Sequence, residues 1–246
     1  MGERRRAHHQ ELEEIVTGIA GKWVLLTGAS RGIGRQVAGA LAEHGCHLIL
    51  QSRKLEHTAP LVAEFQARGL TVHALEAELS DQAQVIGLGQ EALRISGGID
   101  ILFNDAAIQS PWHEDMFTTD PDEYRLSFQV NTIAPITLCN LMLPGMIERG
   151  FGRIVNVTSG IAEQPQLMAY AASKAALDKY VYDMAPHLKG TGVCMNLLDP
   201  GWLRTDLGGP QAPGAVESVL PGALVPVLLD DGTSGKWFSA QEYAES

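Results

Sequence analysis

Cysteine and basic residues are scarce in this sequence. The three cysteines, Cys46, Cys139 and Cys194, are odd in number and far apart along 246 residues. This pattern argues against a disulfide framework and against a zinc site. Lys and Arg number 18 while Asp and Glu number 29, which gives a net charge of −11. A chain this acidic is not typical of nucleic-acid binders or of proteins held to anionic lipid by charge. We therefore expect a reducing, cytoplasmic setting, no nucleic-acid partner and no metal.

A long apolar run is absent as well. No stretch approaches the roughly 18–20 residues that a membrane helix needs, so we expect no membrane partner. Residues 4–6 are three arginines, which are typical of the start of a signal peptide, but Glu11, Glu13 and Glu14 interrupt the apolar segment that should follow. Residues 1–20 are predicted to form an N-terminal extension, either a short helix over residues 11–17 or a surface tail.

Short apolar runs alternate with segments of helical periodicity. Most runs are continuously apolar, as in parallel strands that are covered on both faces. Longer helices are predicted over Pro121–Met146 and Leu167–Leu188. The alternation predicts an α/β fold of the Rossmann type, a doubly wound, mostly parallel seven-stranded sheet with helices on both faces. The predicted strands are Trp23–Thr27, His47–Gln51, Thr71–Glu76, Asp100–Phe103, Arg153–Thr158, Val193–Leu198 and Lys236–Ser239.

A glycine-rich turn follows the first predicted strand, WVLLT. The residues Gly28-Ala29-Ser30-Arg31-Gly32-Ile33-Gly34 have the pattern G-x-x-x-G-x-G and precede a helical segment. Glycine lets the backbone turn sharply and approach a pyrophosphate, while the helix N-terminus offers free N–H groups and partial positive charge. Between a strand and a helix, this pattern predicts a dinucleotide-binding turn rather than a mere tight turn.

The segment Thr27–Gly34, TGASRGIG, resembles the cofactor motif of the short-chain dehydrogenase/reductase family. The resemblance continues from about Gly21 to Phe238. It implies a single NAD(P)-binding Rossmann domain over residues 21–246, with substrate loops at 109–117, 163–168 and 202–214. The further matches are Asn104-Asp105-Ala106-Ala107 at the position of Asn-Asn-Ala-Gly, Asn131 in VNTIAP, Ser159 at the end of RIVNVTS, Tyr170 and Lys174 as Tyr-x-x-x-Lys, and Pro200-Gly201 followed by Thr205.

Tyr170 and Lys174 are four residues apart, so on a helix they share one face. A nearby ammonium, together with an oxidised nicotinamide ring, lowers the pKa of a phenol, which then exchanges a proton with a carbonyl or alcohol oxygen. Ser159 is placed to hydrogen-bond the same oxygen, and the resemblance implies that Asn131 holds a water near Lys174. Taken singly, each residue is more typical of a surface contact or a cap than of a catalytic site. Together with the glycine turn, Asn131, Ser159, Tyr170 and Lys174 are the predicted catalytic residues.

The cofactor is expected to be NADP(H) rather than NAD(H). Family members that prefer NAD place an acid at the end of the second strand, where this sequence has Ser52 followed by Arg53. Arg31 in the glycine turn is a second cation suited to a 2′-phosphate, although both arginines are also consistent with solvated surface charges. The predicted cofactor-binding residues are Gly28, Ser30, Arg31, Gly32, Ile33, Gly34, Ser52, Arg53, Leu79, Asn104, Ala106, Tyr170, Lys174, Pro200, Gly201 and Thr205.

Two positions depart from the family pattern. Asp105 and Ala107 replace an asparagine and a glycine, and Ala107 is tolerable only if its φ stays negative. The interval from Ser159 to Tyr170 is about two residues shorter than is usual in the family. The stretch 208–214, GGPQAPG, is either a plain surface loop or a hinged lid.

The substrate is predicted to be a partly apolar carbonyl compound or alcohol, because the substrate loops carry Trp112, Met168 and Trp202. A 3-oxoacyl thioester on acyl carrier protein is an alternative, although a chain with a charge of −11 is poorly suited to an acidic carrier. A nucleotide-sensing module on the same fold is another alternative. The resemblance also implies a homotetramer or homodimer that is built through the helices carrying Asn131 and Tyr170.

Overall fold

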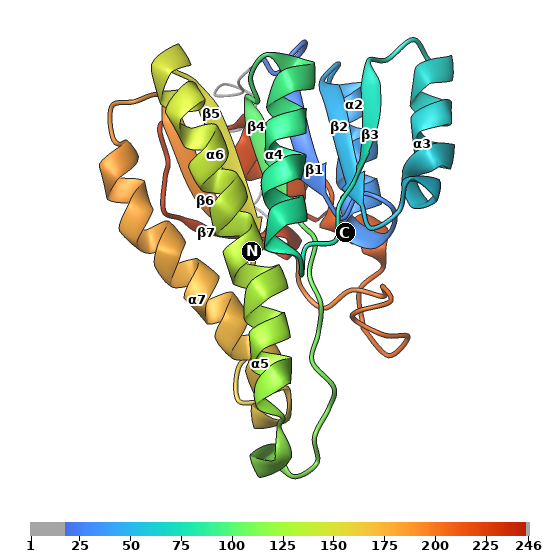
Figure 1. Ribbon diagram of the computed structural model, residues 1–246, viewed down its shortest axis with the longest axis vertical. Coiled ribbons are helices and arrows are strands. Elements are labelled where there is room, and N and C mark those ends of the chain that lie inside the picture. The colour runs from blue at the N-terminus through green and yellow to red at the C-terminus, as the bar shows by residue number, and fades with distance from the viewer. Residues whose placement is uncertain (1–17, 245–246) are drawn as a thin grey trace, which may run out of the picture.

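Seven strands form one sheet in the order β3-β2-β1-β4-β5-β6-β7, and every neighbouring pair is parallel (Figure 1). The computed structural model describes residues 18–244. The predicted Rossmann-type fold is confirmed, with a sheet that is entirely rather than mostly parallel. Each strand begins or ends within one residue of its predicted bounds. The strands are β1 Trp23–Thr27, β2 His47–Ser52, β3 Val72–Glu76, β4 Ile101–Asn104, β5 Gly152–Val157, β6 Val193–Asp199 and β7 Trp237–Ser239.

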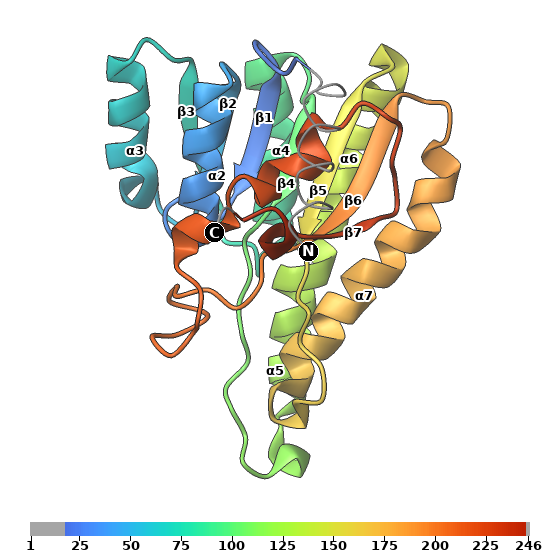
Figure 2. The same ribbon diagram turned by 180° about the vertical axis from the view of Figure 1, so that it is seen from behind.

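Helices cover both faces of the sheet, and each face has its own buried cluster. On one face, α4 and α6 pack through side chains such as Leu88, Leu138 and Met142 (Figure 1). On the other, α2 and α8 come forward when the molecule is turned, and Val37 and Val227 are fully buried there (Figure 2). Burial on two faces explains why most strands are continuously apolar. The helices are α2 Gly32–Glu43, α3 Leu55–Ala67, α4 Gln82–Ser96, α5 Pro121–Phe128, α6 Ala134–Arg149, α7 Met168–Met184 and α8 Val225–Leu228.

The helix predicted over Pro121–Met146 is continuous but contains a π-helical turn at Gln129–Ile133 between α5 and α6. Pro135 lacks the N–H that an α-helix would direct to the carbonyl of Asn131, which favours a wider turn at this point. The whole helix, to Arg149, is long and apolar enough to cross a bilayer by length and composition, so the expectation that no stretch approaches this length was wrong. Since 56% of its most apolar window is buried inside the fold, it fits a core helix equally well.

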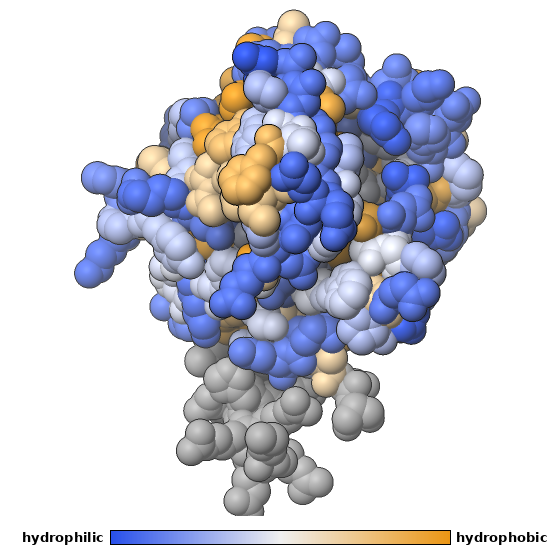
Figure 3. All heavy atoms as spheres, turned by 90° about the horizontal axis from the view of Figure 1, so that it is seen from below, coloured by the Kyte–Doolittle hydropathy of each residue, from blue (hydrophilic) through white to orange (hydrophobic). Residues whose placement is uncertain are grey.

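The predicted helix over Leu167–Leu188 consists of α7 and a closing 3-10 turn at Ala185–Leu188. Together α5 and α7 project beyond the sheet (Figure 1). Seen from this end, a small apolar patch stands out from a mostly hydrophilic surface (Figure 3). Large apolar side chains exposed in the preceding loop include Trp112 and Phe117.

The predicted extension lies almost entirely outside the described residues. Ile19, near its predicted end, is buried in the core, and its carbonyl accepts a hydrogen bond from the Cys46 thiol at 3.3 Å. The chain therefore joins the packed domain at or before this residue.

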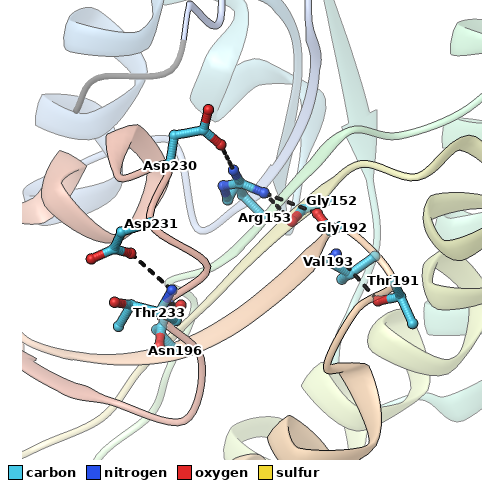
Figure 4. A network of polar contacts seen from close by, with 9 residues as sticks. All are labelled: Gly152, Arg153, Thr191, Gly192, Val193, Asn196, Asp230, Asp231 and Thr233. Carbon is cyan, nitrogen blue, oxygen red and sulfur yellow. Dashed lines mark hydrogen bonds and ion pairs between the residues drawn. The ribbon is translucent and has the colours of Figure 1, made fainter.

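A buried arginine holds the segment that leads to β7. Arg153, on β5, donates to the carbonyls of Gly152 and Gly192 and pairs with Asp230 at 3.0 Å (Figure 4). Asn196 of β6 donates to the carbonyl of Thr233 at 2.9 Å. These bonds hold the segment before β7 against β5 and β6.

Candidate functional site

A cleft of about 1680 Å³ opens at the carboxyl ends of the strands. Its walls come from the turns after β1, β2, β4, β5 and β6. The strand order reverses between β1 and β4, and such a switch point is where open α/β sheets bind ligands. The cleft is therefore the candidate site.

The glycine turn forms one end of the cleft. Gly28 has φ 71°, and a Cβ atom there would lie 2.9 Å from the backbone of Ala106. At Gly34 a Cβ atom would lie 2.4 Å from the carbonyl of Gly28. The amide of Gly28 donates to Gln51 at 3.0 Å. Glycine is thus required for the turn to close, and the first turn of α2, whose N-cap Arg31 makes no side-chain capping bond, faces a space suited to an anion.

The end of β2 carries no acid. Ser52 is buried, and its hydroxyl donates to the carbonyl of Lys54 at 2.7 Å, while the neighbouring Arg53 is exposed at the rim of the cleft. Arg31 is also exposed, and its guanidinium pairs with Asp206 at 2.5 Å. Two arginines without a competing acid at position 52 fit a 2′-phosphate. The ion pair with Asp206 was not predicted from the sequence.

The turn after β4 is fastened to the end of β1. The hydroxyl of Thr27 accepts from the amides of Asp105 and Ala106 at 3.1 and 3.2 Å. Asn104 is buried behind the turn and donates to Asn156 at 2.9 Å. Within residues 18–244, Glu163 is the only non-glycine residue with positive φ, so Ala107 has the negative φ that its methyl group requires.

The structure brings Ser159, Tyr170 and Lys174 together at the other end of the cleft. Ser159 lies just beyond β5, close enough to Tyr170 for its hydroxyl to favour a lower pKa of the phenol. Tyr170 and Lys174 share one face of α7, and the Lys174 ammonium lies 6.0 Å from the centre of the tyrosine ring. Lys174 is buried and donates to the carbonyl of Val157 at 2.7 Å.

The electrostatics of this group differ from the expectation in one respect. Burial raises the pKa of the Tyr170 phenol, the Ser159 hydrogen bond opposes the rise, and the nearby carboxylates of Asp199 and Asp105 add to it. Burial also lowers the pKa of Lys174 to about 8. The predicted lowering of the tyrosine pKa by Lys174 is therefore not a property of the protein alone, because burial and two carboxylates raise this pKa.

Asp105 brings a titratable group to this site where the family pattern has an amide. Burial raises the pKa of its carboxyl to about 7, against the opposing effects of Lys174 and of the Gly34 amide. The departure at this position is evident in the sequence, but no role for the carboxyl was predicted from it.

Asn131 lies in the π-helical turn and is fully buried. Its side chain accepts from the amide of Ile108 at 2.9 Å and donates to the carbonyl of the same residue and to the hydroxyl of Ser173. It therefore joins the turn after β4 to α7. The side chain is occupied by these bonds, which leaves the Asn131 carbonyl, opposite Pro135, as the group able to bind water.

Residues of all three predicted substrate loops line the same cleft. Trp112 and Trp202 line it and are 57% and 60% exposed. The amide of His113 donates to the carbonyl of Gln166 at 3.2 Å, which links the first loop to the second. The third loop is closed at its base by a bridge between Leu203 and Gly214.

Four predicted site residues do not line the cleft, namely Gly34, Asn104, Asn131 and Met168, and all the others do. Gly34, Asn104 and Asn131 support the walls through the contacts described above, whereas Met168 is exposed. Gln51 and Asp206 were missed, because their roles depend on which segments meet in space. Among residues 18–244, no group of three His, Cys, Asp or Glu side chains is arranged to hold a metal ion.

The sequence profile of the family described as short chain dehydrogenase matches residues 22–214. Ketoacyl reductase HetN of Nostoc sp. is 36% identical over 193 residues, which are 76% of this chain and 66% of that protein. A short chain dehydrogenase of Pseudocercospora fijiensis is 34% identical over 197 residues, 78% of this chain and 63% of that protein. The chain thus spans slightly less than two thirds of these relatives. An NADPH-dependent aldehyde reductase-like protein of Arabidopsis thaliana is 29% identical over 95% of this chain and 96% of its own length.

Several solved structures share the fold. A blue fluorescent protein from a metagenomic library, in complex with NADPH, has a TM-score of 0.82 and 26% identity and covers 93% of this chain and 100% of its own. A gluconate 5-dehydrogenase from Burkholderia cenocepacia, in complex with NADP and tartrate, has a TM-score of 0.80 and 27% identity over 89% and 93% of the two chains. A 3-oxoacyl (acyl-carrier-protein) reductase from Agrobacterium tumefaciens with NADP bound has a TM-score of 0.79 and 27% identity over 90% and 93%.

Proposed function

The chain belongs to the short-chain dehydrogenase family, and from this premise we propose that it is an NADP(H)-dependent oxidoreductase acting on a carbonyl compound or a secondary alcohol. The observation that carries the proposal is the meeting of Ser159, Tyr170 and Lys174 in the same cleft as the glycine turn. The residues suited to proton transfer and the turn suited to a dinucleotide therefore line the same cleft.

The residues present fit the cofactor. Only glycine lets the turn at position 28 close against the backbone of Ala106, and the uncapped start of α2 lines the cleft, as a bound pyrophosphate requires. When bound, the nicotinamide would supply or accept the hydride. Ser30, Gly32 and Ile33 would hold the phosphates, and Pro200, Gly201 and Thr205 would lie against the nicotinamide end.

Tyr170 would act as the acid or base. Its phenol lies beside Ser159, whose hydroxyl would bind the same substrate oxygen and stabilise the charge that develops there. Lys174 would favour release of the phenolic proton, since its ammonium lies 6.0 Å from the centre of the ring. The carbonyl of Asn131 would hold the water through which the proton reaches solvent.

Arg31 and Arg53 support a preference for NADP(H) over NAD(H). Both line the end of the cleft near Ser52, the last residue of β2, where no acidic residue stands. Three of the similar solved structures were determined with NADP or NADPH, which agrees with this assignment. Leu79 and Ala106 also line the cleft and would contact the cofactor.

The test is a screen of NADPH and NADH consumption over ketones, aldehydes and quinones, followed by Tyr170→Phe. The variant keeps the ring but loses the proton, so turnover should fall by about 10²–10⁴-fold while NADPH binding stays within about twofold. Tyr182→Phe, on the exposed side of the same helix, is the matched control and should retain full activity. Retained turnover in Tyr170→Phe contradicts the assignment.

Reduction of a 3-oxoacyl thioester is the second candidate. Its support is the 36% identity to a ketoacyl reductase and the likeness to a 3-oxoacyl (acyl-carrier-protein) reductase. NADPH consumption with acetoacetyl thioesters, free and carrier-bound, distinguishes it from the first candidate. Tight NADPH binding with no turnover of any substrate would instead favour a nucleotide-sensing module.

We also place the protein in the cytoplasm as a homodimer or homotetramer. Leu126 and Ile133 are exposed on the helix that carries Asn131, and apolar side chains on a helix surface are typical of an interface. Light scattering at micromolar concentration tests the assembly, and a monomer would contradict it.

A further inference from the structure

Basic side chains gather mainly at one end of the cleft. Among residues 18–244, those that line it are Arg31, Arg53 and His57, which lie where β1 and β2 end, and Lys174. The first three belong to the end assigned to the cofactor phosphate. Of the basic residues lining the substrate end, where Ser159 and Tyr170 lie, Lys174 is thus the only one to consider.

Lys174 is not free to bind a substrate anion. It is only 3% exposed, and its ammonium donates to the carbonyl of Val157 at 2.7 Å. The carboxylates of Asp105 and Asp178 already act on it, as their effect on its pKa shows. Its charge is therefore balanced from within the protein.

Acidic groups line the same end. Asp199 accepts from the amide of Gly201 at 3.0 Å, and a Cβ atom on Gly160, next to Ser159, would lie 2.9 Å from its other oxygen. Glu163 also lines the cleft, with an exposed side chain and φ 57°. A non-glycine residue in this strained conformation is typical of functional loops.

We propose that the substrate end of the cleft takes an uncharged carbonyl compound or alcohol with an apolar body and rejects anionic substrates. An anion there would lose its hydration without gaining a cation and would lie near Asp199 and Glu163. Trp112 and Trp202 offer the apolar surface that an uncharged body needs. The inference rests on the proposed function, whose substrate class it narrows.

The test compares three ketones that share one aliphatic chain. The probes are 5-oxohexanoate, its methyl ester, and the 5-oxohexyl compound that ends in trimethylammonium. The chain keeps the terminal group from altering the reactivity of the carbonyl. We expect kcat/KM for the ester to exceed that for the carboxylate at least tenfold, with the ammonium compound also above the carboxylate. A carboxylate that matches the ester, or two charged probes that are equally poor, would overturn the proposal.

Binding gives a readout that does not need turnover. Each probe is titrated into the Tyr170→Phe protein saturated with NADPH, whose nicotinamide ring is uncharged, and the heat of binding is followed. The same order of affinities is expected. If no probe is turned over yet this order holds, the proposed reaction is wrong and the charge selectivity stands, whereas equal affinities refute the selectivity alone.

A charge variant locates the effect. Glu163→Gln should reduce the ester-to-carboxylate ratio by about two- to tenfold and Glu163→Lys should reduce it further, because each step removes repulsion from the substrate end. Glu148→Gln, which removes an exposed acid on α6 outside the cleft, is the control and should leave the ratio unchanged. An equal response of the control and Glu163→Gln would show that net charge rather than the cleft sets the preference.

Discussion

The ion pair between Arg31 and Asp206 leads to a prediction about the affinities for NADPH and NADH. The two side chains are 64% and 68% exposed and 2.5 Å apart. If Arg31 binds the 2′-phosphate, Asp206 competes for the same guanidinium, and the proposed cofactor has to displace it. Asp206→Asn should therefore tighten the binding of NADPH and leave that of NADH unchanged.

The size of the effect follows from the exposure of the pair. An ion pair in contact with water contributes about 0–1 kcal/mol, which corresponds to at most about fivefold in Kd. Arg31→Gln removes a charged donor to the phosphate, worth about 1.5–3 kcal/mol, and should weaken NADPH binding at least tenfold. Both effects should shrink at high salt, because exposed charges are screened.

The assay is a calorimetric or fluorescence titration of NADPH and NADH at low and high salt. Asp183→Asn is the matched control, because Asp183 forms an equally short and similarly exposed pair with Lys179 outside the cleft. Equal effects of Asp206→Asn on both cofactors, or weaker NADPH binding, would refute the reasoning, since either would mean that Asp206 does not compete with the phosphate.

Two further predictions concern the turns at the strand ends. Gly28→Ala places a methyl group 2.9 Å from the Ala106 backbone at φ 71°, so NADPH binding should be lost and the midpoint of thermal unfolding should fall, by about 1–3 kcal/mol in free energy. Burial raises the pKa of Asp105 to about 7, so the folded state keeps a proton that the unfolded chain releases near pH 4, and this carboxyl lowers stability progressively as pH rises from 4 to 7. The midpoint of Asp105→Asn should accordingly change less between pH 5 and 7 than that of the parent protein, as calorimetry would show, and an equal change in both would contradict the assigned burial.

Much of the architecture is predictable because it is encoded locally. The strand from Trp23 to Thr27 was predicted to the residue, since an apolar run ended by a glycine turn marks both its bounds. The long helix was placed correctly at Pro121, where Asp120 caps the first turn and proline suits the first helical position. Its π-helical turn was not predicted, because the apolar periodicity of a helix does not reveal a single widened turn.

The candidate site was predictable in its residues but not in its contacts. The four-residue spacing of Tyr170 and Lys174 predicts that they share one face of a helix. The structure places both beside Ser159. The pKa of the tyrosine was not predictable, because it depends on burial and on Asp105 and Asp199, which reach the site from other strands.

The sequence by itself determined the alternation of strands and helices, the glycine turn and the helix face that carries Tyr170, because each follows from neighbours within a few residues. Only the tertiary structure decided that Arg31 meets Asp206, that Gln51 holds the amide of Gly28 and that, among residues 18–244, Lys174 is the one basic side chain that lines the cleft beside Tyr170. These features join segments far apart in the chain. These contacts depend on the path of the loops, which cannot be predicted from any local pattern of residues.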